Sequence, residues 1–299
     1  MAFFGVDAKE EEAGMLWVLC GLLAAIAVYL LLIAPGRNAR ARAGAIPRVP
    51  YAHRGLHGRG VPENSLSAFR LAAQKGYGME LDVHLTRDGH LAVMHDADLK
   101  RMCGVAGRIP DMTGKELKAC RLLDTGEQVP LLPEVLDAVR AYHSPLIIEM
   151  KSDGDSWRRL PETLLDCMKS YPGFWCAESF DPRMLWRLKK LSPGTVRGQL
   201  AYDPRKIGEK RREIRYALGA CLLMDFWSRP DFIAYRYDTD GNFSFRVVRK
   251  LFRPGLIAWT VQNERDFERL RSKYDVQIFE GFEPSYTPFE SKQRKGEKT

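Results

Sequence analysis

Residues 80–96 read ELDVHLTRDGHLAVMHD, and they contain two strand-like runs joined by an Asp-Gly turn. An Asp-Gly pair between two alternating runs is a strong signal of a β-hairpin. Side chains two positions apart on a strand share a face, so Glu80 and Asp82 point the same way, and His95 closes the returning strand. Taken alone, such a carboxylate pair more often belongs to a solvated strand face. It also suits one half of a metal-assisted hydrolase site.

Strand-like and helix-like runs alternate from Pro50 onward. The strand-like runs are VPYAH, MELDVHL, PLIIEMK, GFWCAES, TVRGQL, ACLLMDF, GLIAWTVQ and VQIFEGF. Helix-like runs such as SLSAFRLAAQKG separate them. About eight such repeats predict an α/β fold, a TIM (β/α)₈ barrel. An open doubly wound sheet would have a similar rhythm, but no G-x-G-x-x-G follows the first strand and no P-loop is present.

The composition narrows the class of partner. The chain has 299 residues, 45% of them hydrophobic, which is enough for a full core. Its net charge of +8 indicates an anionic partner: a phosphate substrate, an anionic membrane or nucleic acid. The basic residues are scattered, and without a zinc finger, an RNP-type aromatic motif or a basic heptad we expect no nucleic-acid binding. The six cysteines include no C-x-x-C pair, which is typical of neither a disulfide framework nor a zinc site and fits a reducing compartment.

An uncharged run of twenty residues, Met15 to Ala34, precedes the alternating region. It is long enough to cross a bilayer as a helix. The alternatives are a cleaved signal peptide and a buried core helix, but a signal peptide has a basic start and a shorter apolar run, whereas this start is acidic. Four arginines follow the run and only Lys9 precedes it, so the positive-inside rule predicts a single-pass protein of the cell membrane with its C-terminal body in the cytoplasm.

These observations divide the chain into five parts. We expect an N-terminal tail over residues 1–14, a transmembrane helix over 15–34, a basic linker over 35–49, a catalytic barrel over 50–288 and a charged tail over 289–299.

Polar residues recur at the ends of the expected strands, which converge on one mouth in a barrel. Three carboxylates there form a hard-oxygen site for Ca²⁺ or Mg²⁺. Basic side chains suit a phosphate, and two histidines supply groups that titrate near neutral pH. This inventory fits phosphodiester hydrolysis. A carboxylate such as Glu149, which follows an apolar run, costs several kcal/mol to bury unless it is paired or metal-bound. Lys151 is a possible simple partner for it.

The motif AHRG…PENS…AF…GYGMELDVHLTRDGHLAVMHDADLKRMCG closely resembles the signature of the glycerophosphodiester phosphodiesterases, and weaker matches (IEMK, SFDPRML, AWTVQN) extend the resemblance over about residues 50–284. It implies a TIM barrel with a small insertion after the second strand, here Asp96 to Gln128. It also implies a divalent cation, Ca²⁺ or Mg²⁺, and hydrolysis of glycerophosphodiesters to an alcohol and glycerol 3-phosphate. Some family members act on lysophospholipids. By position, the resemblance implies metal ligation by Glu80, Asp82 and Glu149, acid–base roles for His53 and His95, phosphate contacts from Arg54 and Lys151, support from Asn64, and a pocket wall at Trp259.

The chain departs from the family pattern in two places. PENS replaces PENT, which keeps the hydroxyl group, and the last strand reads IFEGFEP where a Thr-Asp is common. Glu280 or Glu283 is the expected substitute. The RYDTDGN segment is not an EF-hand, because its glycine stands at the fourth position of the loop rather than the sixth.

Other features have plainer interpretations. His84 shares the face of the carboxylates and is a candidate for a supporting role, and the remaining histidines are interpreted as structural or surface residues. The basic run 205–215 is interpreted as a solvated helix face, with contact to anionic lipid as the alternative. Two alternatives to the leading function stay open: a lysophospholipase D acting on membrane lipid, and a catalytically inactive barrel that binds phospholipid. The complete set of carboxylates and histidines argues against the inactive barrel.

Overall fold

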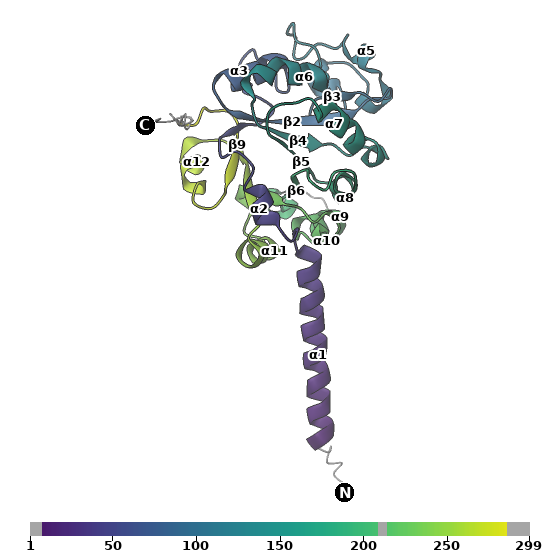
Figure 1. The fold of residues 1–299 in the computed structure, drawn as a ribbon, viewed down its shortest axis with the longest axis vertical. Helices are drawn as coiled ribbons and strands as arrows, with labels where there is room; N and C mark the ends of the chain where they lie inside the picture. The colour runs from purple at the N-terminus through teal and green to yellow at the C-terminus, as the bar shows by residue number, and fades with distance from the viewer. Residues whose placement is uncertain (1–7, 209–213, 286–299) are drawn as a thin grey trace, which may run out of the picture.

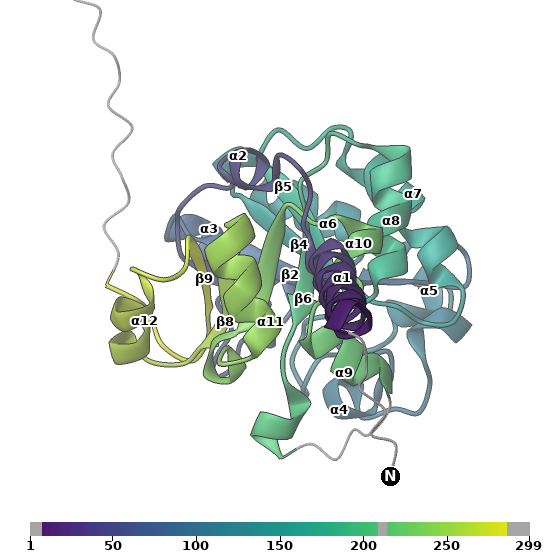
Figure 2. The same cartoon turned by 90° about the horizontal axis from the view of Figure 1, so that it is seen from below.

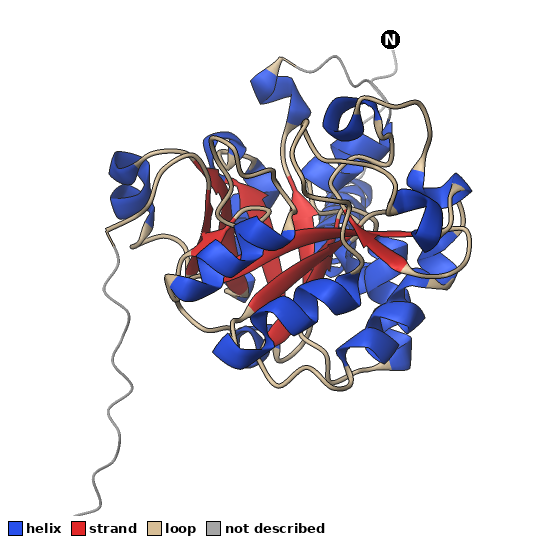
Figure 3. Ribbon diagram, turned by 90° about the horizontal axis from the view of Figure 1, so that it is seen from above, coloured by secondary structure: helices blue, strands red, loops and turns tan. Residues whose placement is uncertain are grey.

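The computed structural model describes residues 8–208 and 214–285. Parallel strands within these ranges close into a barrel, because β1 pairs with both β2 and β9. The barrel strands are β1 (Tyr51–Ala52), β2 (Gly78–Leu85), β4 (Leu146–Met150), β5 (Trp175–Ser179), β6 (Arg197–Ala201), β7 (Phe232–Arg236), β8 (Gly255–Val261) and β9 (Val276–Phe279). Figure 3 shows the strands ringed by helices. The expected TIM barrel is confirmed.

Helices cover the outside of the strands. Apart from α1 (Ala8–Ile33), the α-helices among the described residues are α2 (Ala39–Ala43), α3 (Leu66–Gln74), α4 (Lys100–Cys103), α5 (Gly114–Leu117), α6 (Leu132–Val139), α7 (Leu160–Met168), α8 (Pro182–Leu191), α9 (Ile214–Ala220), α10 (Asp225–Ser228), α11 (Phe243–Val247) and α12 (Glu264–Leu270). Of these, α4 and α5 belong to the insertion, and α2 packs at the amino-terminal end of the barrel. The π-helical turn η6 (Val248–Phe252) continues α11. In α3, the Ser65 hydroxyl caps the first turn by accepting from the Ala68 amide at 3.2 Å, and Phe69, Ala72 and Ala73 bury one face. The buried faces of such helices pack against the outer side of the strands and form the outer core.

The inside of the barrel has an apolar floor. Phe232, Ile147, Leu200 and Ile257 are among the side chains that fill the amino-terminal half of the interior. The Phe232 ring lies so close to Gly198 that a Cβ placed there would stand 1.9 Å from a ring carbon. The floor is therefore tightly packed. Polar side chains lie beyond it, toward the carboxyl ends of the strands.

The hairpin predicted by the opening motif forms as expected, with β3 (Leu91–Val93) antiparallel to β2. The insertion that follows has its own small core, which includes Met102, Ile109 and Leu122. The Thr113 hydroxyl and the Glu116 side chain form a capping box at the start of α5. The insertion is thus a compact addition beside the mouth.

One expected strand is wrong. The run ACLLMDF, residues 220–226, ends α9 and begins α10, and the strand at this place in the barrel is β7. Leu222 adopts a left-handed conformation with φ +56° and packs into the outer core, so the apolar run covers the barrel rather than entering it. A short apolar run does not by itself distinguish a buried strand from a buried helical turn.

The apolar N-terminal segment forms the long helix α1 (Ala8–Ile33), which projects from one side of the barrel (Figure 1). Its stretch from Glu12 to Ile33 is long and apolar enough to cross a membrane and is almost wholly exposed, and a signal sequence would pass the same test. The expected basic linker, residues 35–49, packs against the barrel. It includes α2, which buries Ala39 and Ala43, and its Arg42 Nε lies 2.7 Å from Asp231 Oδ1. Residues 1–7 of the expected N-terminal tail and all of the expected tail 289–299 lie outside the described ranges.

Candidate active site

Three buried carboxylates meet inside the barrel just above the apolar floor. Glu80 and Asp82 point inward from β2, while the alternate residues Leu81 and Val83 pack in the outer core. The parallel register places Asp82 beside Glu149 of β4. Ligand oxygens of Glu80, Asp82 and Glu149 all lie within 4.8 Å of one another. The structure therefore brings together the three residues predicted as metal ligands.

Cationic and amide groups surround these carboxylates. Lys151 Nζ lies 2.8 Å from Asp82 Oδ1 and 2.8 Å from Glu149 Oε1. The Asn64 side-chain amide donates to Asp82 Oδ2 at 2.8 Å. Arg54, in a left-handed turn at φ +54°, donates its backbone N–H to Glu80 Oε2 at 3.0 Å. Each residue predicted to contact phosphate or to support the site thus lies within it.

The pKa values of the three clustered carboxyl groups are shifted in different directions. Burial raises the pKa of Glu80 well above its usual value, and the neighbouring Asp82 and Glu149 raise it further. Burial likewise raises the pKa of Glu149, to about 7, although Lys151 opposes the shift. For Asp82, burial would raise the pKa, but Lys151, His95 and Arg54 hold it well below the ordinary range. Burial therefore keeps Glu80 and Glu149 from ionising easily, while Asp82 stays ionised, and a divalent cation would favour the charged form of all three.

Each of the two predicted acid–base histidines is held by a carboxylate on the same ring atom. His53 Nδ1 lies 2.8 Å from Glu280 Oε2, and His95 Nδ1 lies 2.7 Å from Asp96 Oδ1. The hydrogen bond with His53 lowers the pKa of Glu280 to about 2, so this carboxylate is ionised and can only accept. Nδ1–H of His53 must then be the donor, which leaves its Nε2 free, 3.9 Å from Glu80.

The pKa of Asp96 is also lowered, because hydrogen bonds from Arg101 and His95 outweigh its burial. Asp96 is therefore ionised as well, and Nδ1–H of His95 is the donor in their hydrogen bond. In both rings the carboxylate engages Nδ1, so Nε2 is the nitrogen that remains for another partner.

A chain of ion pairs runs from Asp96, the partner of His95, to Arg54, through Arg101 and Glu63, which were not predicted. Arg101 Nη2 lies 2.7 Å from Glu63 Oε1, and Arg101 Nε lies 2.5 Å from Asp96. Glu63 in turn accepts from Arg54 Nη1 at 2.9 Å. Glu63 stands inside the PENS motif, which is the only sequence signal that could have indicated it.

The predicted pocket residue Trp259 belongs to an aromatic wall. Its ring centroid lies 5.8 Å from that of Phe180 and 6.1 Å from that of Tyr202. Phe180 and Tyr202 directly follow β5 and β6, so all three residues lie at the carboxyl ends of strands, and Phe180 is 42% exposed. Phe180 and Tyr202 were not predicted. This wall offers an apolar surface at the same end of the barrel as the carboxylates.

A fourth inward carboxylate, Glu178, was also missed. It lies beside Glu149 in the register of β4 and β5 and is 1% exposed. Among the described residues its Oε2 has no hydrogen-bond partner, and burial raises its pKa well above the usual value. Its place in the strand GFWCAES could have indicated an inward side chain, but the register with Glu149 is not readable from one strand.

Comparisons with known proteins place this site in a family. A sequence profile of the glycerophosphoryl diester phosphodiesterase family matches residues 53–276, which is most of the barrel. The chain belongs to this family. The expectation of an enzyme of this type is confirmed by its likeness to named relatives. A glycerophosphodiester phosphodiesterase of Caldanaerobacter subterraneus subsp. tengcongensis is 30% identical over 239 residues, which cover 73% of this chain and 88% of that protein. One of Bacillus subtilis is 29% identical over 252 residues, covering 73% and 78%.

Solved structures agree on the fold. A glycerophosphodiester phosphodiesterase of Thermotoga maritima superposes with a TM-score of 0.60 at 27% identity, covering 78% of this chain and 94% of that one. A phosphodiesterase of Oleispira antarctica, solved with its product sn-glycerol-3-phosphate, has a TM-score of 0.65 at 21% identity, covering 80% and 94%.

A sequence relative of another kind matches a shorter part of the chain. The human lysophospholipase D GDPD1 is 36% identical, but over only 112 residues, 33% of this chain and 35% of that protein.

The two glutamates named as candidates in the last strand have different neighbours in the structure. Glu280 reaches His53, whereas Glu283 pairs with Lys75 on the surface. His57, expected to be structural or on the surface, lies with its Nε2 3.6 Å from Glu280 and forms a group with His53. His84 Nε2 lies 3.0 Å from the His95 carbonyl oxygen, which matches its expected supporting place. In the RYDTDGN segment, Asp240 pairs with Lys273 and Asn242 caps α11, so its oxygens are engaged in the fold.

Proposed function

We propose that this chain hydrolyses glycerophosphodiesters to an alcohol and glycerol 3-phosphate. The observation that carries the proposal is the pair of histidines, each with a carboxylate on Nδ1 and a free Nε2, beside a buried cluster of three carboxylates. Phosphodiester hydrolysis needs one proton removed from the attacking water and one given to the leaving alkoxide. His53 and His95 supply two such groups.

In this proposal Glu80, Asp82 and Glu149 hold one divalent cation, Ca²⁺ or Mg²⁺. When bound, such a cation supplies positive charge that stabilises the developing negative charge on the phosphoryl oxygens. Arg54 and Lys151 contact the phosphate and hold it in line. Lys151 already bridges Asp82 and Glu149, so its ammonium group lies where added negative charge is stabilised. Asn64 fixes the orientation of Asp82 by its hydrogen bond.

The two histidines take different roles. Burial lowers the pKa of His95 below its ordinary value; Asp82 opposes this lowering, and Lys151 and Arg54 add to it. A lowered pKa means that His95 is mostly neutral at neutral pH, which is the form a general base needs. The sequence alone led us to expect His95 as the acid. From its lowered pKa we instead assign removal of the water proton to His95 and protonation of the leaving alkoxide to His53.

A test of the metal site uses Glu149→Gln, which keeps the shape of the side chain and removes its charge. We expect turnover of a glycerophosphodiester to fall by orders of magnitude and the metal concentration for half-maximal activity to rise. Glu283→Gln, which removes a surface carboxylate paired with Lys75, is the matched control and should change neither. Unchanged activity and metal dependence in Glu149→Gln would remove this residue from the proposed site.

A test of the histidines compares two leaving groups. His53→Ala and His95→Ala should each lose about 10²–10⁴-fold in turnover of a glycerol-based diester. The double variant should be little worse than either single variant, because groups acting in one proton-transfer cycle fail as a unit. The leaving group of a p-nitrophenyl phosphodiester is p-nitrophenolate, which departs without being protonated. This substrate should therefore restore turnover in His53→Ala and not in His95→Ala. Near wild-type turnover of the glycerol-based diester in both single variants would refute acid–base catalysis by these residues.

A second substrate class is favoured by the aromatic wall. Phe180, Tyr202 and Trp259 offer an apolar surface suited to an acyl-bearing glycerol, and an apolar helix at the N-terminus would hold the enzyme at a membrane. Lysophospholipase D activity keeps the same chemistry and changes only the substrate. Parallel assays of glycerophosphodiesters and lysophospholipids, each with Ca²⁺ and with Mg²⁺, would separate the two. We further propose that α1 spans the cell membrane once and that the barrel lies in the cytoplasm.

A further inference from the structure

Exposed apolar side chains gather where α1 meets the barrel. Phe226 and Trp227 of α10 are 44% and 37% exposed, and Phe243 of α11 is 64% exposed. The Tyr29 ring of α1 stacks on Phe243 with centroids 6.4 Å apart, and its hydroxyl donates to Ser244 Oγ at 2.8 Å. Figure 2, seen along α1, shows α10 and α11 beside the helix. The end of the apolar helix and the exposed aromatics of the barrel thus form one continuous surface.

The depth of this surface follows from the geometry of α1. The apolar stretch ends at Ile33, and a helix rises about 1.5 Å per residue, so Tyr29 lies about 6 Å inside the end of the stretch. Phe243 stacks on Tyr29 and is therefore at a similar depth. If α1 spans a bilayer, this depth is the boundary between headgroups and acyl chains, where aromatic side chains concentrate.

The segment α11–η6, residues 243–252, has the pattern of an interfacial helix. Phe245 and Val248 pack into the barrel, while Phe243 and Leu251 are exposed. Arg246 and Lys250 are exposed on the same side of the segment. A helix whose outer face mixes large apolar and basic side chains lies in the plane of a bilayer interface. Figures 1 and 2 together show α11 crossing the direction of α1, which is the orientation that such a helix needs.

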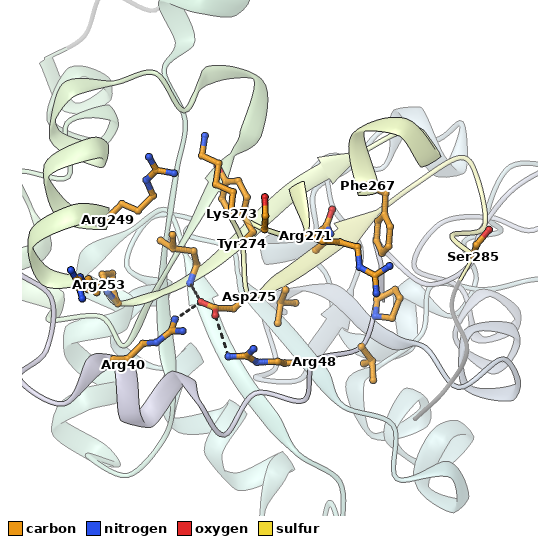
Figure 4. Close-up of a pocket in the computed structure, with 17 residues that line it drawn as sticks. Arg40, Arg48, Arg249, Arg253, Phe267, Arg271, Lys273, Tyr274, Asp275 and Ser285 are labelled. Atoms are coloured by element: carbon orange, nitrogen blue, oxygen red, sulfur yellow. Dashed lines mark hydrogen bonds and ion pairs between the residues drawn. The ribbon is translucent and has the colours of Figure 1, made fainter. Parts of the chain in front are cut away.

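An arginine-rich groove of about 800 Å³ opens beside η6 (Figure 4). Among the described residues that line it, the basic ones are Arg40, Arg48, Arg249, Arg253, Arg271 and Lys273, and Asp275 supplies the only carboxylate. Asp275 is already paired, with Arg40 at 2.6 Å and with Arg48 at 3.3 Å. Neither Arg249 nor Arg253 has an ion-pair partner among the described residues. Guanidinium groups without a carboxylate partner suit the phosphate of a lipid headgroup.

We propose that the surface formed by α10 and α11–η6 lies in the interface of a bilayer containing anionic phospholipid. Its aromatic and leucine side chains enter the acyl-chain boundary, and Arg249 and Arg253 bind headgroup phosphates. The inference rests on the proposed membrane-spanning role of α1. It also gives the barrel an orientation. The helix α2 marks the end of the barrel before the first strand, and α4 marks the end with the mouth. The two helices lie on opposite sides of α1 in Figure 2. Neither end of the barrel then faces the membrane, and the mouth opens along the bilayer surface.

The test uses the full chain reconstituted in vesicles that carry a photoactivatable phospholipid with its reactive group near the headgroup. Peptides containing Phe226, Trp227 and residues 243–253 should be labelled together with α1. Peptides from the insertion, residues 100–123, should not. Labelling confined to α1 would overturn the proposal. Failure to label α1, with release of the chain by alkaline carbonate, would instead refute the membrane-spanning role on which the proposal rests.

The phosphate contacts are tested by lipid charge. Labelling of residues 243–253 should rise when phosphatidylglycerol replaces part of the phosphatidylcholine. Arg249→Gln with Arg253→Gln should remove most of this increase, because each basic residue near an anionic surface contributes about five-fold. Arg70→Gln with Arg265→Gln removes the same charge from exposed positions elsewhere and should not. Equal labelling in neutral and anionic vesicles would overturn the headgroup contacts. Loss of the increase on adding millimolar inorganic phosphate, at constant ionic strength, would assign the groove to free phosphate instead.

Discussion

Glu280 and Glu283 stand three residues apart after the last strand, and the sequence leaves both as candidates for one role. Only the structure separates them, because the choice depends on the turn at Gly281, which has φ +78° and directs the two side chains to different neighbours. By contrast, Glu80 and Asp82 could be predicted as a pair from the two-residue period of a strand. Their meeting with Glu149 depends on register between strands about 70 residues apart along the chain, and the same dependence hid Glu178.

The two glutamates provide an internal comparison. Glu280→Gln replaces the ionised acceptor of His53 Nδ1–H with a neutral amide oxygen, so the hydrogen bond weakens and the ring loses the charge that stabilises its protonated form. We expect turnover to fall about 10–100-fold, the usual cost of losing such a supporting carboxylate. Glu283→Gln should leave turnover unchanged. The measurement is turnover of a glycerophosphodiester, with melting curves to show that both variants fold. Equal activity of the two variants would exclude Glu280 as the residue that orients His53.

At the scale of elements, the sequence predicts the barrel well where strand and helix patterns differ in period. The hairpin of β2 and β3, the capped helix α5 and the strand β4 all occur where expected. The error at residues 220–226 has a physical cause. An apolar run bounded by polar residues satisfies both a buried strand and a buried helical turn, and the left-handed residue Leu222 that decides the matter has no sequence signature.

The tightly packed floor of the barrel leads to a prediction at this scale. Gly198 of β6 lies against the Phe232 ring, so Gly198→Ala forces the ring or the strand to move. Overpacking of this kind costs about 1–3 kcal/mol in free energy of unfolding. Gly194→Ala is the matched control, because a Cβ there meets nothing within 4 Å. Thermal melting followed by circular dichroism should show a lower midpoint only for Gly198→Ala. Equal midpoints would mean that the floor is looser than the described packing.

At the scale of the whole molecule, the chain is a barrel with an apolar helix attached to its side wall. The segment between them is short and structured: Arg229 Nη1 donates to the Ala34 carbonyl at 2.8 Å, and Arg42 pairs with the buried Asp231. The composition of residues 37–48, rich in arginine and alanine, suggests a free basic linker. Their packing could not be predicted, since the small alanines fit the barrel only because Gly255 leaves room for Ala43.

The orientation of the whole chain across a membrane is the last prediction. Arg37, Arg40, Arg42 and Arg48 follow the apolar stretch, whereas only Lys9 precedes it. Insertion comes before folding, so these arginines act as free charges at that stage even though three of them later form ion pairs in the barrel. The positive-inside rule then retains the barrel in the cytoplasm. In a bacterial host, green fluorescent protein fused after Thr299 should fluoresce, and alkaline phosphatase fused there should be inactive. Changing the four arginines to glutamine while adding four lysines before residue 12 should shift chains toward the opposite orientation, seen as rising phosphatase activity. A fully active phosphatase fusion on the unchanged chain would show that the barrel lies outside the cytoplasm.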